Sequence, residues 1–496
     1  TITLIIISCA ILLVNIIGHS IHHRFDATED KDYTLSDATK NMLKNLQDPI
    51  TITAYFTENL PPQYAEVRKE FKDIISEYAS LSNGKIAFRF IDPNESPELE
   101  QEAINSGIGP VLISVREKDR NEQQKAFLGA KIEVGTQKEV IPIIQKQTPM
   151  EYTLSTSIKK LTIVNKPYIG IVSGHGELPL QNLGQAMSEI GFLYNIEEVI
   201  LSDTLNLSKY KTLVINAPKS QYSETDLGIL DNYIAQGGKL FINLEHINAD
   251  LQQSMQLTLI TTGLEGWLTE KGIVVEDNVV IDKKCGNIGV VQQHGLISMT
   301  APISFPYIPI VSNFSDHPIT SSLKGLSFAF ASSIQYTGDD KYQFTPLIFT
   351  SESSATQTLP AYINIQKKWT DHDFTTANIA LGGVLTGSFN NGPETSIVVV
   401  GDGDYAASQG NQKVNADNIN LFANTIDWLS DDTGLIELRS KGINYRPIKE
   451  LSDTNKATIK WVNFLLPIIL IIVYGIVNWQ IRLIRRNKRT EENYVQ

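Results

Sequence analysis

Polar side chains capable of chemistry follow four apolar segments of this sequence, each at the point where the segment ends. They are imidazoles, carboxylates and one amide: His175 and Glu177, Asn216, Glu245 and His246, and Asp402 and Asp404. If the four segments are neighbouring parallel strands, their carboxyl ends meet at one edge of a sheet, where open α/β sheets bind ligands. Several carboxylates and two imidazoles on one rim would suit a cation, a sugar or a hydrolytic water.

The same residues can also be interpreted as turns. Gly174-His175-Gly176 and Gly401-Asp402-Gly403-Asp404 are rich in residue types whose backbone freedom and local hydrogen bonds suit tight turns. Both interpretations stay open at this point. We treat six residues as candidate ligand-binding residues and expect no catalytic residue, metal or cofactor: His175, Glu177, Glu245, His246, Asp402 and Asp404.

The motifs of several enzyme classes are absent from the sequence. There is no G-x-S-x-G elbow, no G-x-x-x-x-G-K-[ST] loop and no H-E-x-x-H. Without the phosphate-binding loop, the chain cannot itself be the motor ATPase of a transporter. Cys9 and Cys285 form no C-x-x-C pair for redox work or zinc. We therefore expect that the chain is not an enzyme; the alternatives are a cell-envelope hydrolase or a periplasmic solute receptor that uses the rim.

An alternation of strands and helices surrounds the candidate residues and predicts a doubly wound α/β domain over residues 168–430. Strands are expected at 168–172, 194–201, 212–216 and 239–244, and helices at 180–190 and 223–236. Ser223 and Asp226 form an N-terminal capping pair for the second of these helices. Such an alternation is typical of a mostly parallel sheet with helices on both faces. We expect a late strand at 397–400 to rejoin this sheet and a helix at 415–429 to close it. The less regular, proline-containing residues 246–375 are expected to form an insertion or a β-rich subdomain.

A smaller α/β domain is predicted over residues 19–164. Strands are expected at 50–57, 85–92 and 110–116, a hairpin at 125–134 and 139–144, and helices at 36–46, 62–81, 97–105 and 151–161. This order resembles a thioredoxin-like fold, and Gly109-Pro110-Val111 stands where such folds carry a cis-proline. No cysteine follows the first strand, so the resemblance implies architecture and not oxidoreductase chemistry. A generic α/β module is the alternative.

The last apolar run of the chain, Trp461 to Trp479, predicts a transmembrane helix. It carries no charge and is long enough, at ~1.5 Å per residue, to cross a hydrocarbon core of ~30 Å. Trp461 and Trp479 lie at its ends, where indole rings favour the membrane interface. We assign a span to 460–481, a juxtamembrane segment to 431–459 and a basic cytoplasmic tail to 482–496. The tail carries Arg482, Arg485, Arg486, Lys488 and Arg489.

A second apolar run at residues 1–18 predicts another transmembrane helix. No small-x-small cleavage site follows it, so we interpret it as an uncleaved anchor and not a signal peptide. Because the first residue is Thr, we expect further chain before it. With both termini in the cytoplasm, the large ectodomain between the anchors would be periplasmic. The net charge of −13 argues against a nucleic-acid partner.

Several short motifs follow one another along the chain: His23-Arg24-Phe25-Asp26-Ala27-Thr28-Glu29-Asp30, Tyr33-Thr34-Leu35-Ser36, Phe90-Ile91-Asp92-Pro93, Gly129-Ala130, Glu151-Tyr152 and Ser173-Gly174-His175-Gly176-Glu177. In this order they resemble the GldG family of auxiliary proteins of gliding-motility ABC transporters. The layout of two terminal anchors around an ectodomain also fits this family. These motifs are structural and not catalytic, so they indicate family and not mechanism.

This resemblance implies an inner-membrane subunit that works beside a multi-span ABC permease and a cytoplasmic ABC ATPase in envelopes of the Bacteroidetes type. It implies a role in gliding or secretion, and a second domain similar to the GIFT domain, an amidotransferase-like sheet without the nucleophile. Two anchors can pack on permease helices, and Asn463 and Asn478, near Trp461 and Trp479, can hydrogen-bond across such an interface. Dimeric permeases would make two copies per complex plausible.

Overall fold

The computed structural model describes residues 34–117, 120–146, 148–163, 165–251, 253–294, 297–321, 323–408, 414–431 and 453–492. The chain divides into two compact units, Thr1–Ile443 and Asn444–Gln496, which we describe separately. The predicted anchor at residues 1–18 and most of the juxtamembrane segment at 431–459 lie outside the described residues.

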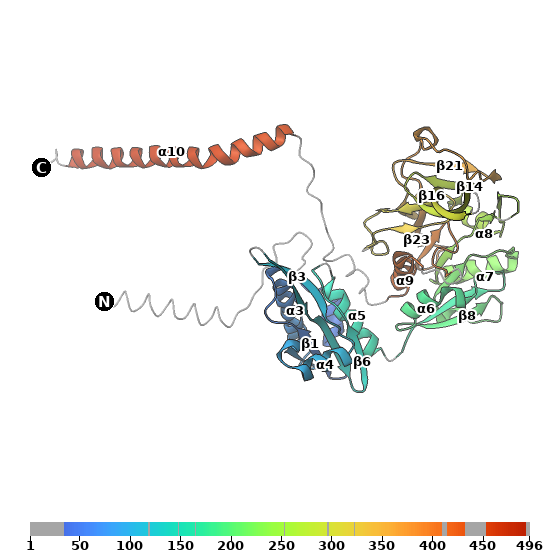
Figure 1. Cartoon of the computed structure of the whole chain (residues 1–496), viewed down its shortest axis with the longest axis horizontal. Coiled ribbons are helices and arrows are strands. Elements are labelled where there is room, and N and C mark those ends of the chain that lie inside the picture. Colours follow the sequence, from blue (N-terminus) through green and yellow to red (C-terminus); the bar gives the residue numbers. More distant parts are fainter. Residues whose placement is uncertain are drawn as a thin grey trace. The chain divides into compact units, whose positions relative to one another are not determined.

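The first sheet has the order β2-β1-β5-β6 and forms the N-terminal α/β domain (Figure 1). Its strands are β1 (Ile50–Phe56), β2 (Ile86–Ile91), β5 (Leu128–Val134) and β6 (Gln137–Ile141). β1 runs parallel to β2 and antiparallel to β5, and β5 and β6 form the predicted hairpin. The strand predicted at 50–57 is therefore confirmed, and the structure places it in the interior of the sheet.

Helices cover both faces of this first sheet. They are α2 (Asp37–Lys44), α3 (Pro62–Leu81), α4 (Pro97–Asn105) and α5 (Met150–Thr162), with a 3-10 turn η1 at Pro93–Glu95. Apolar side chains at helical spacing along α3, among them Phe71 and Ile75, pack in one core with Leu43 of α2 and Leu154 of α5. Ala103 of α4 packs in a second core with Tyr55, whose side chain points to the opposite face of β1.

Two predictions for this domain were wrong. The strand expected at 125–134 is divided at Phe127. Here Phe127 N donates a hydrogen bond to the Thr57 hydroxyl, and Thr57 N donates one to Phe127 O, so Phe127 belongs to neither strand. The residues before it belong to β4 (Arg120–Ala126), which pairs with β3 (Val111–Glu117) in a separate two-stranded sheet. Gly109-Pro110 is not a cis-proline; within the described residues, the cis peptide bond precedes Pro360.

The second sheet has the order β17-β20-β23-β24-β10-β9-β7-β8. Five of its strands are parallel neighbours: β7 (Tyr168–Ser173), β8 (Asn195–Ile200), β9 (Tyr210–Asn216), β10 (Lys239–Asn243) and β24 (Glu394–Val400). Antiparallel strands extend the sheet beyond β24: β23 (Ala380–Ser388), β20 (Gln343–Phe349) and β17 (Asn313–Phe314). The parallel core and the late strand that rejoins it are as the sequence predicted.

The helices of this domain lie on the two faces of the second sheet. They are α6 (Gly184–Ile190) after η2 (Leu180–Leu183), α7 (Glu224–Ala235), α8 (Leu264–Thr269) and α9 (Ala416–Ser430), with η3 at Leu207–Lys209. On one face α6 and α9 share a core with Phe241, whose ring centroid is 5.3 Å from that of Phe422. On the other face, α7 and α8 share a core with Ile242. Adjacent residues of β10 thus supply both cores.

The segment between β10 and β23 is rich in strands, most of them short. They are β11 (Ile247–Asp250), β12 (Gln256–Leu259), β13 (Ile273–Val275), β14 (Asn278–Asp282), β15 (Cys285–His294), β16 (Ile297–Val311), β18 (Leu326–Ser327), β19 (Ile334–Tyr336), β21 (Ser354–Thr358) and β22 (Ala361–Tyr362), with η4 at Asp371–Asp373. Phe305 and Tyr307 lie in a separate core of this segment. Because β17 and β20 come from the same segment, part of it belongs to the main sheet.

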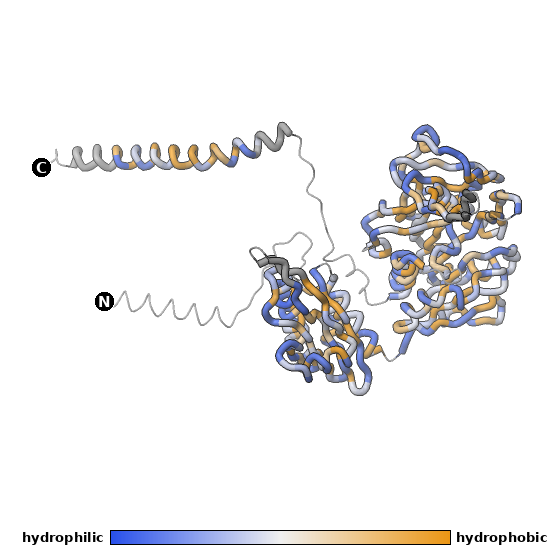
Figure 2. Tube along the Cα trace, viewed as in Figure 1, coloured by the Kyte–Doolittle hydropathy of each residue, from blue (hydrophilic) through white to orange (hydrophobic). Residues whose placement is uncertain are grey.

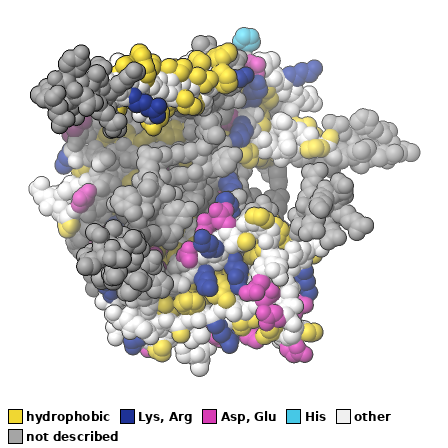
Figure 3. All heavy atoms as spheres, turned by 90° about the vertical axis from the view of Figure 1, so that its left-hand side faces the viewer, with side chains coloured by type: hydrophobic (Ala, Val, Ile, Leu, Met, Phe, Trp, Pro, Cys, Tyr) yellow, Lys and Arg dark blue, Asp and Glu magenta, His cyan; other side chains and the backbone are white. Residues whose placement is uncertain are grey.

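The second unit contains α10 (Asp453–Glu492), whose middle is apolar (Figure 2). Residues Lys460–Ile484 are long and apolar enough to cross a membrane by length and composition, and none of this stretch is buried. Trp461 is 60% exposed and Trp479 is 63% exposed. Figure 3 shows hydrophobic side chains gathered on the surface, and the exposed large apolar residues include Phe464, Ile471 and Tyr474 of α10. A helix with this much apolar exposure fits lipid better than water.

Candidate functional site

The six candidate residues follow β7, β10 and β24, whose carboxyl ends lie along one edge of the second sheet. β9 and β10 separate β7 from β24 in the sheet. At ~4.8 Å per strand, His175 and Glu177 therefore start about 14 Å from Asp402 and Asp404. The six residues share one edge, as the sequence suggested, but they divide into three groups with different partners.

The first group, which we call the carboxylate cluster, consists of Glu245, Asp402 and Asp404. One carboxylate oxygen from each of the three lies within 4.8 Å of the others. Asp402 is 2% exposed and accepts two backbone hydrogen bonds, from Ala329 N at 2.7 Å and from Asp404 N at 3.1 Å. Glu245 and Asp404 are only partly buried, so the cluster reaches from the interior of the domain to solvent.

The carboxylate cluster is a site of unfavourable negative charge. Burial raises the pKa of Glu245 to about 8; the charge of Asp404 adds to this rise, and that of Lys219 opposes it. Burial, and then the charges of Asp404 and Glu245, raise the pKa of Asp402 well above its ordinary value. Carboxylates at this separation cannot all be ionised without a positive charge beside them. Protons or positive charge at the cluster relieve this repulsion.

Gly403 allows the end of β24 to reach the ends of β9 and β10. A Cβ atom at this position would lie 2.7 Å from Cβ of Ala217 and 2.8 Å from Cβ of Glu245, closer than real Cβ atoms approach. Glycine is therefore required between the two aspartates. The glycine spacing of Gly401-Asp402-Gly403-Asp404 serves packing, while its carboxylates form the cluster.

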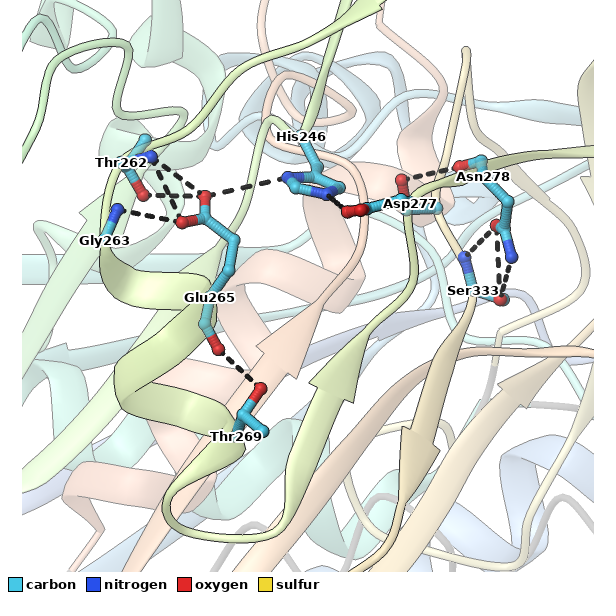
Figure 4. A network of polar contacts seen from close by, with 9 residues as sticks. His246, Thr262, Gly263, Glu265, Thr269, Asp277, Asn278 and Ser333 are labelled. Carbon is cyan, nitrogen blue, oxygen red and sulfur yellow. Dashed lines mark hydrogen bonds and ion pairs between the residues drawn. The ribbon is translucent and has the colours of Figure 1, made fainter. Parts of the chain in front are cut away.

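The second group, the His246 cluster, consists of His246, Glu265 and Asp277 (Figure 4). His246 follows Glu245 in sequence but is 4% exposed and has different partners. Its Nε2 lies 2.9 Å from Asp277 Oδ1, and its Nδ1 lies 3.6 Å from Glu265 Oε1. Burial lowers the pKa of His246, but the hydrogen bonds and charges of Glu265 and Asp277 outweigh it, so this pKa lies above its ordinary value. The geometry favours the doubly protonated imidazolium, because an ionised carboxylate only accepts hydrogen bonds.

The His246 cluster joins three elements of the second domain. Glu265 accepts hydrogen bonds at the start of α8, at 2.8 Å from both the Thr262 hydroxyl and Gly263 N. Asp277 lies in the turn between β13 and β14. His246 therefore connects the end of β10 both to α8 and to the β-rich segment, which is a structural role.

The third group, the His175 cluster, consists of His175, Glu177, Tyr222 and Asp226. The His175 ring stacks on Tyr222 with centroids 3.8 Å apart, and its Nε2 lies 3.3 Å from Asp226 Oδ2. Glu177 accepts from His175 N at 2.7 Å and from the Tyr222 hydroxyl at 2.5 Å. Asp226 is also the acidic member of the predicted capping box with Ser223 at the start of α7. The two carboxylate oxygens of Glu177, together with Asp226, thus hold the turn after β7 against the start of α7.

Sequence inspection missed Tyr222, Glu265, Asp277 and Lys219 as partners of the candidate residues. For Glu265 a signal was present, because Thr262 and Glu265 have the spacing of a capping box. The other three lie in loops or turns whose partners are distant in sequence, and no short-range pattern marks them.

Comparison with known proteins gives a consistent picture at the level of family. The sequence model of a domain of unknown function matches residues 29–133. A protein of Borreliella burgdorferi is 22% identical over 481 residues, covering 92% of this chain and 93% of its own.

Two solved structures show only weak likeness to this chain. The IFT52 N-terminal domain is 13% identical with a TM-score of 0.35, and the match covers 53% of this chain and 97% of that domain. A ThuA-like protein from Parabacteroides merdae is 12% identical with a TM-score of 0.30, and the match covers 58% of this chain and 94% of that protein. Scores this low do not establish a shared fold.

The match that decides the family covers the second α/β domain. The sequence model of a family described as an ABC-type uncharacterized transport system, which comprises auxiliary proteins, matches residues 166–431. This stretch is more than half of the chain and contains all six candidate residues. The chain therefore belongs to the auxiliary family of the ABC-type transport system.

Proposed function

We propose that this protein is a membrane-anchored auxiliary subunit of an ABC transporter, with a large periplasmic ectodomain that engages cargo or an envelope partner and catalyses no reaction itself. The family match over residues 166–431 is the observation that carries this proposal. Membership of this family indicates an accessory role in transport and an association with the permease or ATPase of an ABC transporter. The resemblance to GldG proteins adds gliding motility or secretion as the process.

The apolar helix α10 supports the membrane anchor. Its stretch Lys460–Ile484 satisfies the length and composition of a span, and basic residues follow it in the sequence. Basic residues beside a span favour the cytoplasmic side, so the two α/β domains would lie in the periplasm. Asn463 and Asn478 lie in α10 near its two tryptophans, where a permease helix could accept or donate a hydrogen bond.

The contacts around both histidines support a role without catalysis. The carboxylates of Asp226 and Glu265, beside His175 and His246, also accept backbone hydrogen bonds at the starts of α7 and α8, from Ser223 N and Gly263 N. Groups committed to helix ends and turns are poor candidates for acid–base chemistry on a substrate. The finer fold assignments, thioredoxin-like for the first domain and GIFT-like for the second, are supported by their strand–helix alternation and belong to this proposal.

A pull-down from native membranes tests the proposed partnership. The tagged full-length protein, extracted in mild detergent, should recover a multi-span permease and an ABC ATPase, identified by mass spectrometry. A variant without residues 453–492 should recover less of both, while His175→Gln, a change far from α10 in the sequence, should recover as much as the wild type. Recovery of this chain alone, or only as a homo-oligomer, would contradict the proposal.

A cellular assay tests the absence of catalysis. His175→Gln and Glu265→Gln variants that are folded and still assemble with the permease should retain gliding or secretion. Loss of function with normal assembly would instead favour the hydrolase or solute-receptor alternative.

A further inference from the structure

We propose that the carboxylate cluster of Glu245, Asp402 and Asp404 binds a hard divalent cation, Ca²⁺ or Mg²⁺, that links the ends of β10 and β24. This site goes beyond the accessory transport role and does not depend on it. It also differs from the expectation, drawn from sequence alone, that the chain has no metal site.

The donor set of the cluster suits such a cation. The three carboxylates present oxygens within 4.8 Å of one another, a separation that one ion can bridge. Asp402 and Asp404 have the D-x-D spacing that calcium loops use to bring alternate carboxylates to one ion. Carboxylate and carbonyl oxygens are the ligands that Ca²⁺ and Mg²⁺ prefer.

Buried oxygens without a hydrogen-bond partner add a second, independent observation. Asn243 is 0% exposed, and among the described residues its Oδ1 has no hydrogen-bond partner; its Nδ2 donates to Asn216 Oδ1 at 2.8 Å. Buried side-chain carbonyl oxygens normally accept a hydrogen bond. An oxygen such as Asn243 Oδ1, an orphan oxygen without a partner, therefore points to a bound group that the protein atoms do not supply.

The register of the sheet places Asn243 at the ends of the two strands that lead into the cluster. Asn243 pairs with Val400, and Leu244 N donates to Val400 O at 2.9 Å. Glu245 and Asp402 follow two residues later, beyond the last residues of β10 and β24. Within β10, Asn243 lies on the same face as Phe241, which packs in one core with Val400 and Tyr405. The orphan oxygen thus lies on the face of the sheet where Tyr405, the residue after Asp404, is packed.

Tyr405 supplies a further buried oxygen near the cluster. Its side chain is 5% exposed, and its hydroxyl has no hydrogen-bond partner within the part of the chain that the structure describes. Tyr405 directly follows Asp404, and its ring centroid lies 5.6 Å from that of Phe328, the neighbour of Ala329, whose N donates to Asp402. A hydroxyl oxygen there adds a neutral donor to the set.

The local charge favours a cation of charge two. The oxygens of three carboxyl groups, those of Glu245, Asp402 and Asp404, lie within 4.8 Å of one another. A divalent ion there would offset more of their negative charge than a monovalent one. The ion would also fasten Asp404, which is partly exposed, to Glu245 on the neighbouring strand.

Terbium luminescence tests the site in the full-length protein. The probe is Tb³⁺, added to detergent-purified chain stripped with EDTA and excited through tyrosine, with Ca²⁺ and Mg²⁺ as competitors. We expect saturable emission that one of the two ions displaces, and at least about tenfold weaker binding in both Asp404→Asn and Glu245→Gln. Tyr405→Phe should lower the emission severalfold, because it removes the nearest sensitiser.

A matched control and a stability measurement decide the outcome. Glu198→Gln removes an exposed carboxylate from β8, in the same sheet, and should bind like the wild type. Ca²⁺ or Mg²⁺ should raise the unfolding temperature of the wild type and of Glu198→Gln but not of Asp404→Asn, with circular dichroism confirming that each variant is folded.

Three results would overturn the proposal. One is no saturable binding by about 10 mM of either ion, well above the weakest extracellular calcium modules. Another is equal loss of binding in Glu198→Gln and Asp404→Asn, which would mean binding to surface charge in general. The third is a wild-type unfolding temperature that neither Ca²⁺ nor Mg²⁺ raises, which would mean that no ion links the ends of β10 and β24.

Discussion

Two histidines of this protein meet carboxylates at both ring nitrogens. For His246 these are Asp277, at 2.9 Å, and Glu265, at 3.6 Å. For His175 they are Asp226, at 3.3 Å, and Glu177, at 3.5 Å. Each imidazole thus ties a turn after a strand to the start of a helix. At the scale of single residues, the polar groups at this edge hold the backbone in place.

The stability of the protein should therefore depend on His246. His246→Gln keeps a donor for one carboxylate and leaves the other without its partner, so we expect the free energy of unfolding to fall by about 1–3 kcal/mol. Thermal unfolding of the full-length protein, followed by circular dichroism, measures the loss. His372→Gln changes an exposed histidine and should shift stability by less than about 0.5 kcal/mol. Equal shifts in the two variants would contradict a structural role for His246.

His317 should make the protein less stable in acid. Its Nδ1 accepts a hydrogen bond from Ile319 N at 3.2 Å, and its ring packs against Trp428 with centroids 5.0 Å apart. Burial lowers the pKa of His317, and the charge of Asp316 only partly opposes this. The unfolded chain therefore binds the proton more readily, so stability is lost as the pH falls from the unfolded pKa of about 6.5 towards the lower folded pKa.

The pH dependence of His317→Gln measures this effect. Between pH ~7 and pH ~5 its unfolding temperature should fall less than that of the wild type, because the variant has no imidazole to protonate. His372→Gln, which keeps His317, should follow the wild type. If His317→Gln and the wild type have the same slope, the buried imidazole does not contribute.

Reading residues from the sequence predicted which side chains lie at the edge of the sheet but not which of them touch. The candidates follow strands that do end at one edge, because strand ends are marked locally by apolar runs and glycines. Their partners, such as Asp277 for His246, come from other loops, and the order β8-β7-β9-β10-β24 decides the distances. That order depends on packing between distant segments.

At the scale of elements, two glycines differ in the space around them, one inside a helix and one at a closely packed strand end. A Cβ at Gly228, inside α7, would meet nothing within 4 Å, whereas a Cβ at Gly401, after β24, would collide with the carbonyl oxygen of Ser332. Gly228→Ala should therefore raise stability by about 0.5–1 kcal/mol through helix propensity. Gly401→Ala should lower it by about 1–3 kcal/mol through overpacking.

Thermal unfolding of the two alanine variants checks this contrast directly, since the chemical change is the same in both. Circular dichroism should show the wild-type helix content in each variant. A loss of stability in Gly228→Ala, or none in Gly401→Ala, would contradict the packing described around α7 and β24.

Elements with strong local signals were predicted well, and those fixed by distant contacts were not. The capping pair Ser223 and Asp226 marked the start of α7, and Pro62 marked that of α3. In contrast, the division of the strand at Phe127 depends on hydrogen bonds with Thr57, 70 residues away. The entry of β17 and β20 into the main sheet likewise depends on β23 and has no local signature.

At the scale of the whole molecule, the proposed topology predicts which side of the membrane each end of α10 faces. In a chain with Cys9→Ser and Cys285→Ser, a cysteine at exposed Asp340 should react with a membrane-impermeant maleimide in cells whose outer membrane is permeable. A cysteine at Lys488, after the span, should react only after lysis. The reverse pattern would contradict a periplasmic ectodomain.

The pairing of β24 with β10 sets the order in which the second domain folds as it is made. Gly238 and Thr395, which are hydrogen-bonded across this pair, are 157 residues apart. At roughly 5–20 residues per second, the edge of β10 waits roughly 8–30 s for its neighbour. During that time the unpaired backbone N–H and C=O groups on this edge of β10 can pair with another chain. A chain whose synthesis stops before β24 therefore keeps an unpaired strand edge, which makes it prone to aggregate.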